Sequence, residues 1–418
     1  MVIAHGNFNA GTLNIVLNRF HVYLSCLYNV TNWCIMQEMK KKILICTPLY
    51  PPDIGGPATY SKLLFDELPR KGIDVSVLSF GEVRKFPKVI RHFLYFLKIL
   101  NLGRSVDVFF AQDPVSVGLP VCLASCFLRK KFILKIVGDY AWEQFQSQIS
   151  NLKSQKFITL EEFQDRKFDW LTELRRKVER GVGKRAYKII VPSEYLKKIV
   201  LMWGVGSEKI NVVYNAFDFS RFFQSQTYGS PTQPFLKRAE SDFVLFSAGR
   251  LVTWKGFQAL VEIFPDLVKQ IPNLKLYIIG DGPEREALMF QVSIFKFQDK
   301  VILTGQLSHD EVLRYLNTGD IFVLNTGYEG LSHQILEAMA VGIPVVTTNI
   351  GGNPELIQNN ESGILVEYNN KEQLKNAIFK LYKDKNLRKE LVKKAKEKVK
   401  EFSKERMINE TINILKTT

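Results

Sequence analysis

The chain has 418 residues, 46% of them hydrophobic and 24% charged, with a formal net charge of +15. That length exceeds one compact core and suits two domains of roughly 150–200 residues each, while the composition is that of a globular protein. No run of about 18 uninterrupted apolar residues occurs, so the sequence predicts no membrane-spanning helix.

Residues 1–38 differ in composition from the rest of the chain. Polar residues such as Asn18 and His21 interrupt the apolar ones, which makes the segment too polar for the hydrophobic part of a signal peptide. At Met39 the sequence changes to three lysines and then the apolar run Ile43–Cys46, typical of the first strand of a cytosolic α/β protein. Our hypothesis is that translation starts at Met39 and that the leader is not native or is a disordered appendage; leader peptides detected in the native protein by mass spectrometry would refute it.

Residues 39–215 are expected to form an N-terminal Rossmann-like domain, because apolar strand patterns alternate with helical ones. The helical pattern predicted over residues 58–71 places Leu63, Leu64 and Leu68 on one face. Strands are predicted over residues 43–47, 74–80, 107–112, 132–137 and 188–191.

Residues 216–400 repeat the alternation and predict a second, C-terminal Rossmann-like domain. Residues 214–234 are rich in Ser, Thr, Gly and Pro, the composition of a linker. The charged stretch 386–415 predicts helix, and its end, within 401–418, is expected to cross back to the first domain. Strands are predicted over residues 244–248, 275–279, 301–304, 321–324, 344–347 and 363–366, and helices over 256–270, 309–317 and 332–341.

The two halves together predict an α/β fold in which two Rossmann-like domains with parallel sheets face each other across a cleft. Ligands of such sheets bind beyond the carboxyl ends of the strands. Motifs that directly follow predicted strands are therefore the candidates for a binding site.

One such motif carries two glutamates, Glu329 and Glu337, in a loop and helix that lead through a glycine turn to a buried strand. Eight residues of helix span roughly 12 Å, on the order of the distance from a transferred sugar to the ribose of its nucleotide. The start of this helix offers free amides to a diphosphate, those of Leu331, Ser332 and His333. The alternative is two solvated charges, which the apolar surroundings of Glu337 in the sequence disfavour.

Two cations, Arg250 and Lys255, lie five residues apart on the loop after a predicted strand. Arg250 offers a bidentate fork and Lys255 a point charge, so together they can clamp a pyrophosphate and stabilise the negative charge of a leaving group. The alternative is a pair of ordinary surface cations.

Two glycine turns also follow predicted strands. The turn with Gly282 and Glu284 lets a flat base approach the backbone, although the same sequence is typical of a plain turn. Gly55 and Gly56, at the start of a predicted helix, admit a phosphate or sugar close to the backbone, with an ordinary strand–helix turn as the alternative.

Together these four stretches resemble the family 4 glycosyltransferases, which are retaining enzymes of the GT-B fold. The resemblance extends from Met39 to the end of the chain and is strongest over residues 243–366. It implies a transfer of a sugar from a nucleotide-diphosphate sugar to an acceptor, a glycan or a lipid-linked glycan, that binds at the N-terminal domain. Base, sugar and linkage are not specified by these motifs.

The resemblance also implies residue roles. Glu329 would contact the donor sugar at the catalytic centre, and Glu337 the ribose hydroxyls. The cations Arg250 and Lys255 would hold the diphosphate, and the loop of Gly55 and Gly56 would border the phosphates and the acceptor. The turn of Gly282 and Glu284 would lie beside the base. The other positions implied to bind substrate are Gly330, Leu331, Ser332 and His333.

One departure from the family concerns the segment after the fourth predicted strand, where many relatives carry a histidine. Here Asp139 is the nearest polar residue. It is a catalytic candidate that bonds a sugar hydroxyl or orients the acceptor; a helix cap before residues 140–146 is the alternative. For His333 we favour a neutral, hydrogen-bonding role over that of a general base.

No cofactor and no metal are expected. Family members usually act without a metal, and the chain contains no Asp-x-Asp sequence. The two cations and the helix start would take the place of a divalent ion.

The net positive charge of the chain has two possible explanations, which concern the basic segments of the N-terminal domain. Residues 84–98 mix cations with large apolar residues, and residues 175–185 add more cations. A segment of this kind either lies at an anionic membrane surface or forms a packed helix with a solvated basic face. Five cysteines without a Cys-x-x-Cys pair favour a reducing compartment, so we expect a cytoplasmic protein, with the inner face of the membrane as a further site; Cys122 and Cys126 are expected to be core thiols.

Two other functions are weighed against glycosyl transfer. A nucleotide-sugar epimerase of the same architecture would release a sugar isomer without an acceptor. A basic nucleic-acid-binding protein would show a steep salt dependence of its affinity, but the sequence contains no recognised nucleic-acid motif.

Overall fold

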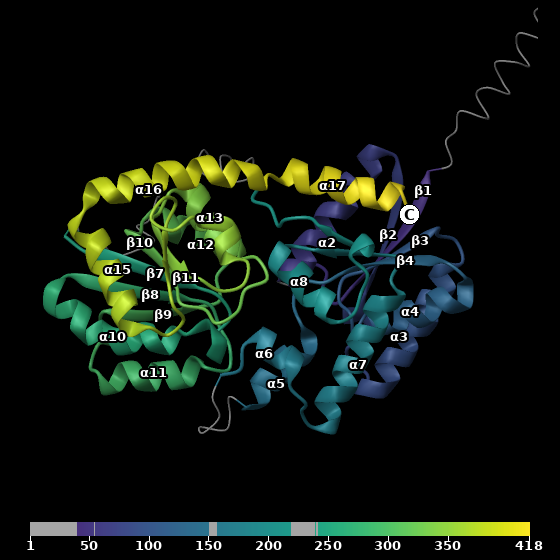
Figure 1. Ribbon diagram of the computed structural model, residues 1–418, viewed down its shortest axis with the longest axis horizontal. Helices are drawn as coiled ribbons and strands as arrows, with labels where there is room; N and C mark the ends of the chain where they lie inside the picture. Colours follow the sequence, from purple (N-terminus) through teal and green to yellow (C-terminus); the bar gives the residue numbers. More distant parts are fainter. Residues whose placement is uncertain (1–39, 54, 150–156, 219–238, 240) are drawn as a thin grey trace, which may run out of the picture.

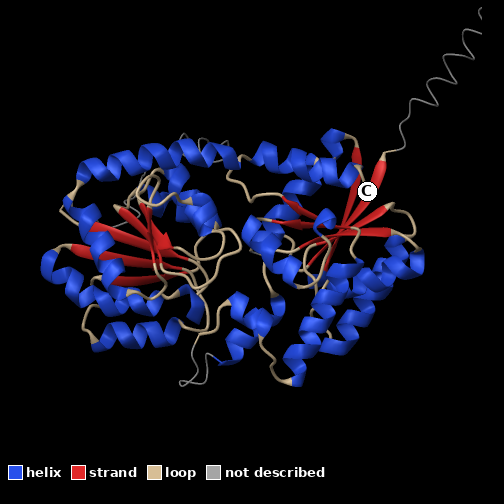
Figure 2. Cartoon of the chain, in the orientation of Figure 1, coloured by secondary structure: helices blue, strands red, loops and turns tan. Residues whose placement is uncertain are grey.

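The computed structural model describes residues 40–418 except 54, 150–156, 219–238 and 240. It consists of two α/β domains, each built on a six-stranded parallel sheet (Figures 1 and 2). The predicted two-domain fold is therefore confirmed. The leader 1–38 and most of the predicted linker 214–234 lie outside the described residues.

The first sheet has the strand order β2-β1-β3-β4-β5-β6. Each strand predicted here is present within two residues of its predicted bounds, and the three-residue strand β6 was not predicted. The strands are β1 (Lys41–Thr47), β2 (Ile73–Ser79), β3 (Val108–Ala111), β4 (Lys131–Lys135), β5 (Lys188–Val191) and β6 (Ile210–Val212).

The helices of this domain and its short 3₁₀ turns cover both faces of the sheet. They are α2 (Gly56–Glu67), η1 (Pro69–Lys71), η2 (Phe80–Val83), α3 (Lys88–Gly103), α4 (Gly118–Leu128), α5 (Tyr140–Ile149), α6 (Leu160–Asp165), α7 (Trp170–Arg185), α8 (Glu194–Met202) and η3 (Ser207–Lys209).

The second sheet has the order β12-β11-β10-β7-β8-β9, again with every pair parallel. Its strands are β7 (Phe243–Ala248), β8 (Leu274–Ile279), β9 (Val301–Gly305), β10 (Ile321–Leu324), β11 (Val345–Thr348) and β12 (Ile364–Val366). Its helices and turns are η4 (Thr253–Lys255), α10 (Phe257–Gln270), α11 (Arg285–Ile294), α12 (His309–Asn317), α13 (His333–Val341), α14 (Asn353–Leu356), α15 (Lys371–Lys383) and α16 (Lys385–Lys398).

The C-terminal segment joins the two domains from outside the cleft. The predicted continuous helix is interrupted by η5 (Val399–Phe402), and α17 (Lys404–Lys416) begins after Ser403, whose hydroxyl accepts a hydrogen bond from the amide of Arg406 at 3.3 Å. Figure 1 shows α16 over the second domain and α17, in yellow, over the first. The Tyr60 hydroxyl lies 3.0 Å from that of Thr411, so α17 is fixed to α2.

Side-chain alternation along the strands explains how both faces of a sheet are buried. On β1, Leu44 and Cys46 belong to the core beneath α3, α4 and α7, whereas Ile43 and Ile45 belong to the core beneath α2 and α17. The crossing-back of α17 therefore completes the core of the first domain.

Some expectations about cysteines and cations are wrong. Cys122 is buried, but Cys126, one helical turn later, lies on the exposed side of α4. Arg176 is not a surface cation: its guanidinium is buried and donates to the carbonyls of Gln164 and Arg166 at 2.8 Å.

In the described part of the chain, no helix combines the length and apolarity that crossing a membrane requires.

Candidate functional site

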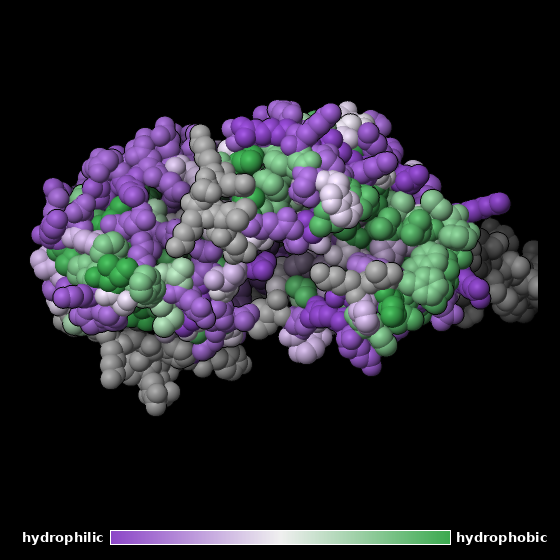
Figure 3. Space-filling view, turned by 90° about the horizontal axis from the view of Figure 1, so that it is seen from below, coloured by the Kyte–Doolittle hydropathy of each residue, from purple (hydrophilic) through white to green (hydrophobic). Residues whose placement is uncertain are grey.

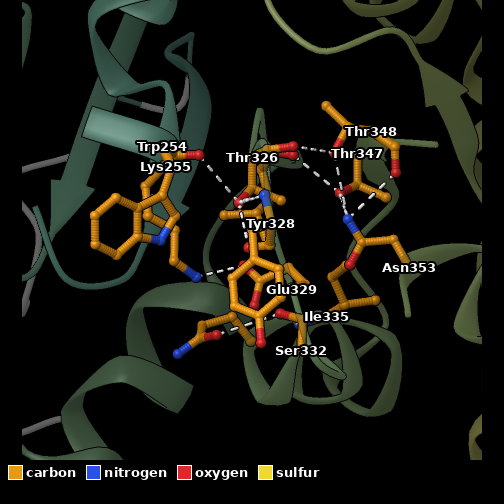
Figure 4. A network of polar contacts seen from close by, with 12 residues as sticks. Trp254, Lys255, Thr326, Tyr328, Glu329, Ser332, Ile335, Thr347, Thr348 and Asn353 are labelled. Carbon is orange, nitrogen blue, oxygen red and sulfur yellow. Dashed lines mark hydrogen bonds and ion pairs between the residues drawn. The ribbon is translucent and has the colours of Figure 1, made fainter. Parts of the chain in front are cut away.

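The site lies where the carboxyl ends of β7, β8 and β10 face the first domain, and Figure 3 shows the surface hollowed between the two domains. At its centre the Lys255 ammonium donates a hydrogen bond to Glu329 Oε1, and the two form an ion pair (Figure 4). Their side chains are only 12% and 10% exposed. The structure thus brings together two residues that lie 74 positions apart in the sequence.

A network of threonine hydroxyls holds the loop that carries Glu329 (Figure 4). The Thr326 hydroxyl donates to the carbonyl of Tyr328 at 2.9 Å and is 3.3 Å from that of Trp254, next to Lys255. The Thr348 hydroxyl donates to the Thr326 carbonyl at 2.6 Å. Because these groups are buried, the loop has little freedom, and Glu329 and Lys255 are held in register.

The start of α13 is close to the first domain. A Cβ on Gly330 would lie 2.6 Å from the carbonyl oxygen of Val137, which follows β4, so only glycine allows this approach. The Asn215 side chain donates to the Leu331 carbonyl at 3.1 Å. Glycine at this position therefore serves the contact between the domains.

The first backbone amides of α13 are not paired within the helix. The Ser332 hydroxyl caps the helix by accepting from the amide of Ile335 at 3.3 Å. The amides of Leu331, Ser332 and His333 have no hydrogen-bond acceptor among the described residues. They remain available to an anion.

Glu337, the fifth residue of α13, has a partner that was not predicted from the sequence. Its Oε1 lies 3.0 Å from Nε2 of His309, the first residue of α12. The pair explains how a carboxylate is accommodated within the apolar helix. The sequence offered no signal for it, because His309 and Glu337 come from different helices.

Arg250 is exposed at the same edge of the sheet, on the loop between β7 and η4. Near it, a Cβ on Gly282 would lie 2.4 Å from the Leu251 carbonyl oxygen, so the packing of two loops requires glycine at this position. Glu284 accepts from the Gln258 amide at 2.9 Å, and partial burial raises its pKa.

On the opposite side of the cleft, Gly55 and Gly56 form the entry to α2. Gly55, at a φ of 153°, is the N-cap residue. A Cβ on Gly56 would meet no described atom within 4 Å, so this glycine has free space beside it.

Asp139 is not placed as a catalytic residue. It is 2% exposed; its Oδ1 accepts from the amide of Trp142 at 2.8 Å, and its Oδ2 accepts from the Gln164 side chain at 2.9 Å. Both oxygens are thus used inside the domain. The helix-cap alternative describes its position, and the expectation of a contact with sugar is corrected.

His333 lies exposed at the start of α13, within the cleft. The dense protein around the cleft lowers its pKa, against the field of Glu337, which raises it. This direction favours the neutral imidazole that the sequence analysis expected.

Two further residues face the cleft and were not assigned from the sequence. Glu143, in the first turn of α5, is half-buried, and the hydroxyl of Tyr328 is buried with no hydrogen-bond partner. The sequence did contain a signal for Glu143. It is a polar residue in the first turn of the helix after β4, in the segment where many relatives carry a histidine. Among the described residues, no three His, Cys, Asp or Glu side chains are grouped so as to hold a metal ion.

Comparison with known proteins places this geometry in a family. Residues 54–221 match the model of the family described as Glycosyltransferase Family 4, and residues 232–398 match that of Glycosyl transferases group 1. The two matches cover the two domains in turn. The chain belongs to the family 4 glycosyltransferases. The resemblance recognised in the sequence is therefore confirmed.

Curated relatives of this family 4 glycosyltransferase align over part of its length. N-acetyl-alpha-D-glucosaminyl L-malate synthase of Bacillus anthracis is 29% identical over 205 residues, 49% of this chain and 52% of that protein. The 2-deoxystreptamine N-acetyl-D-glucosaminyltransferase of Niallia circulans is 32% identical over 137 residues, 32% of this chain and 35% of that protein. The alignments thus span about half or less of these relatives.

Solved structures match the family 4 glycosyltransferase over both domains. Anabaena HepE in complex with UDP and glucose has a TM-score of 0.67 at 18% identity, covering 90% of this chain and 100% of that chain. Sucrose-phosphate synthase from Thermosynechococcus elongatus has a TM-score of 0.69 at 17% identity, with 90% and 99% covered. These matches confirm the GT-B fold, and neither the epimerase nor the nucleic-acid alternative is favoured by the comparisons.

Proposed function

We propose that the protein transfers a sugar from a nucleoside-diphosphate sugar to an acceptor hydroxyl, with retention of anomeric configuration and without a metal ion. The observation that carries this proposal is the convergence of Arg250, Lys255, Glu329 and the free amides of α13 at one edge of the second sheet, facing the first domain. Cations and helix amides together form a site for a diphosphate.

Each residue of the site has a separate role in this proposed reaction. The bond between the anomeric carbon and the β-phosphate oxygen breaks, and its electron pair leaves with the diphosphate, which Arg250, Lys255 and the α13 amides stabilise. Glu329, fixed by Lys255, accepts hydrogen bonds from hydroxyls of the transferred sugar. Glu337 accepts from the ribose. The acceptor hydroxyl, which enters from the first domain beside Gly56, forms the new bond to the anomeric carbon, and its proton passes to the departing phosphate.

The diphosphate charge is compensated in this proposal by the two cations and the helix start. We propose a uridine nucleotide as the first ligand to test, because the HepE structures contain UDP and UDP-glucose. Both curated relatives described above are named for an N-acetylglucosaminyl group, so UDP-N-acetylglucosamine joins UDP-glucose as a donor to test.

A thermal-shift screen of nucleotides and nucleotide sugars tests the proposal, since a ligand that binds the folded state raises the melting temperature by mass action. The matching ligand is expected to stabilise the wild type. Lys255→Ala should lose the shift, whereas Lys269→Ala, which removes an exposed lysine of the same domain, should keep it. A Lys255→Ala variant that responds like the wild type would refute the assignment.

A second part of the proposal concerns where the acceptor is found. We propose that the surface formed by α3 and α4 contacts an anionic membrane, which suits a lipid-linked acceptor. Phe93 and Phe127 are 59% and 73% exposed there, and Figure 3 shows hydrophobic side chains gathered at this end of the molecule. Arg129, Lys131 and Arg185 line a shallow cavity of about 700 Å³ beside α4, so cations border the apolar surface.

Co-sedimentation with vesicles tests this part. Binding to phosphatidylserine vesicles at low salt should fall at high salt and in vesicles of phosphatidylcholine alone. A variant with Phe93→Ser and Phe127→Ser should lose most of the binding, while its response to nucleotides stays that of the wild type. Equal binding of variant and wild type would rule this surface out.

A further inference from the structure

Glu143 is held against the second domain by its neighbour in the chain. Trp142 is fully buried, and its ring lies 5.4 Å from that of Trp254 and 4.8 Å from that of Tyr328, between ring centroids. Trp254 directly precedes Lys255, and Tyr328 directly precedes Glu329. The first turn of α5 is therefore fixed to both loops that carry the diphosphate-binding and sugar-binding residues.

The Glu143 carboxyl and the Tyr328 hydroxyl share one small region of the cleft. A Cβ on Gly138 would lie 2.6 Å from Glu143 Oε1 and 3.1 Å from the Tyr328 hydroxyl oxygen, so both groups border the same point. The Tyr328 hydroxyl is buried without a hydrogen-bond partner. No hydrogen bond or ion pair joins the Glu143 carboxyl to another described residue. The Glu143 carboxyl and the Tyr328 hydroxyl are therefore both available to bind a ligand.

The charges around Glu143 make its protonation sensitive to a bound anion. Burial, followed by the negative charge of Asp139, raises the pKa of Glu143 to about 7, while Arg250 and Lys255 oppose this shift and Asp113 adds to it. These groups come from the elements on both sides of the cleft. The groups that act in turn on the neighbouring Tyr328 hydroxyl are Glu143, Tyr195, Asp139 and Glu329.

A diphosphate bound by Arg250 and Lys255 would bring further negative charge close to this carboxyl. Like charges disfavour the carboxylate, and the same ligand would occupy the two cations that stabilise it. A neutral carboxyl, in contrast, is a hydrogen-bond donor, as is the phenol of Tyr328 beside it.

We propose that Glu143 binds the donor in its protonated form and donates a hydrogen bond to a diphosphate oxygen, opposite Arg250 and Lys255 and with the Tyr328 hydroxyl as a second donor. The inference rests on the proposed function, since it takes the diphosphate to lie between the two domains. The proton comes from solvent and is taken up as the nucleotide binds. Glu143 thereby supplies a contact to the leaving group from the first domain.

Isothermal titration of UDP in two buffers of different ionisation enthalpy measures this proton uptake. At pH 7.5 a carboxyl with a pKa of about 7 is mostly ionised when free, so its full protonation takes up about 0.8 proton per UDP bound. Protons exchanged by UDP itself are common to all variants. The expected difference between wild type and Glu143→Gln is therefore about 0.8 proton.

Affinity provides a second readout. The Gln amide also donates a hydrogen bond, so E143Q should keep UDP affinity within about three-fold of the wild type at pH 6.5, whereas E143A should lose about ten-fold. Between pH 6.5 and 8.5 the affinity of the wild type should fall more steeply than that of E143Q. As a matched control, Glu82→Gln removes a carboxyl of the same domain that pairs with Lys98, and should leave both readouts unchanged.

The outcomes separate the two proposals. UDP binding that is lost in Lys255→Ala, together with equal proton uptake in wild type and E143Q, would overturn the role of Glu143 and leave the proposed function intact. If the wild type binds neither UDP, nor any other nucleoside diphosphate, nor inorganic pyrophosphate, both proposals fail.

Discussion

The ion pair between Lys255 and Glu329 gives the sharpest test of the site, because it contributes to both stability and binding. Lys255→Ala removes the cation and leaves Glu329 with a side chain only 10% exposed and no counter-charge. Its effect on stability is separable from its effect on nucleotide binding. The two are measured on the same variants.

The magnitude follows from the burial. Removing one partner of a buried pair costs about 3–5 kcal/mol, since an uncompensated charge remains in a medium that solvates it poorly. Because the cleft is open on one side and admits water to Glu329, we expect the lower end, about 3 kcal/mol, for Lys255→Ala. In the double variant Lys255→Met/Glu329→Gln no charge is left unpaired, so most of this loss should be restored.

Urea unfolding of the wild type, Lys255→Met, Glu329→Gln and the double variant forms a double-mutant cycle, which isolates the coupling of the pair. We expect a coupling of about 2–3 kcal/mol and, in the two variants that lack Lys255, loss of the thermal shift by the nucleotide. The reasoning is refuted by a coupling below about 0.5 kcal/mol, the value for independent residues. A double variant that is restored in stability but still binds UDP would separately refute the role in binding.

Three further predictions address the frame of the site. Gly280→Ala should lower the free energy of unfolding by more than about 3 kcal/mol, because its φ is 135° and a Cβ would lie 2.0 Å from the Gly249 carbonyl oxygen. The control Gly181→Ala lies within α7 and has no close neighbour, so it should be neutral or stabilising in the same urea assay. Glu337→Gln should weaken UDP about ten-fold or more by calorimetry, while inorganic pyrophosphate binds as to the wild type; equal losses for both ligands would contradict a contact with ribose. Leu415→Ala should cost about 2–5 kcal/mol in urea unfolding, since this side chain is fully buried between α17 and the first sheet, and a loss below about 1 kcal/mol would show that α17 is not part of that core.

The alternation of apolar strands with amphipathic helices determined the fold from the sequence. The parallel strands are buried on both faces, so each reads as a short apolar run, and the predicted strands lie within two residues of the observed ones. The motif with Glu329 and Glu337 and the cations Arg250 and Lys255 follow predicted strands, and this order in the sequence predicts that they lie at one edge of a sheet.

Tertiary structure alone decided which of these groups meet. The partners Lys255 and Glu329 are 74 residues apart, and His309 and Glu337 are 28 apart, on separate elements. Spacing within one segment carries no information on such pairs. The same holds for Gly282, whose glycine is required by a loop that packs against it from another strand.

Asp139 and Glu143 show most directly what the sequence alone cannot predict about this site. Asp139 directly precedes α5 and Glu143 lies in its first turn, so their positions in the sequence do not show which of the two carboxylates faces the cleft. The fold turns Asp139 inward, where it caps α5 and bonds Gln164, and turns Glu143 toward the cations of the other domain. Which carboxylate faces the cleft depends on how α5 packs through Trp142 against the second domain, and that contact exists only once both domains are folded.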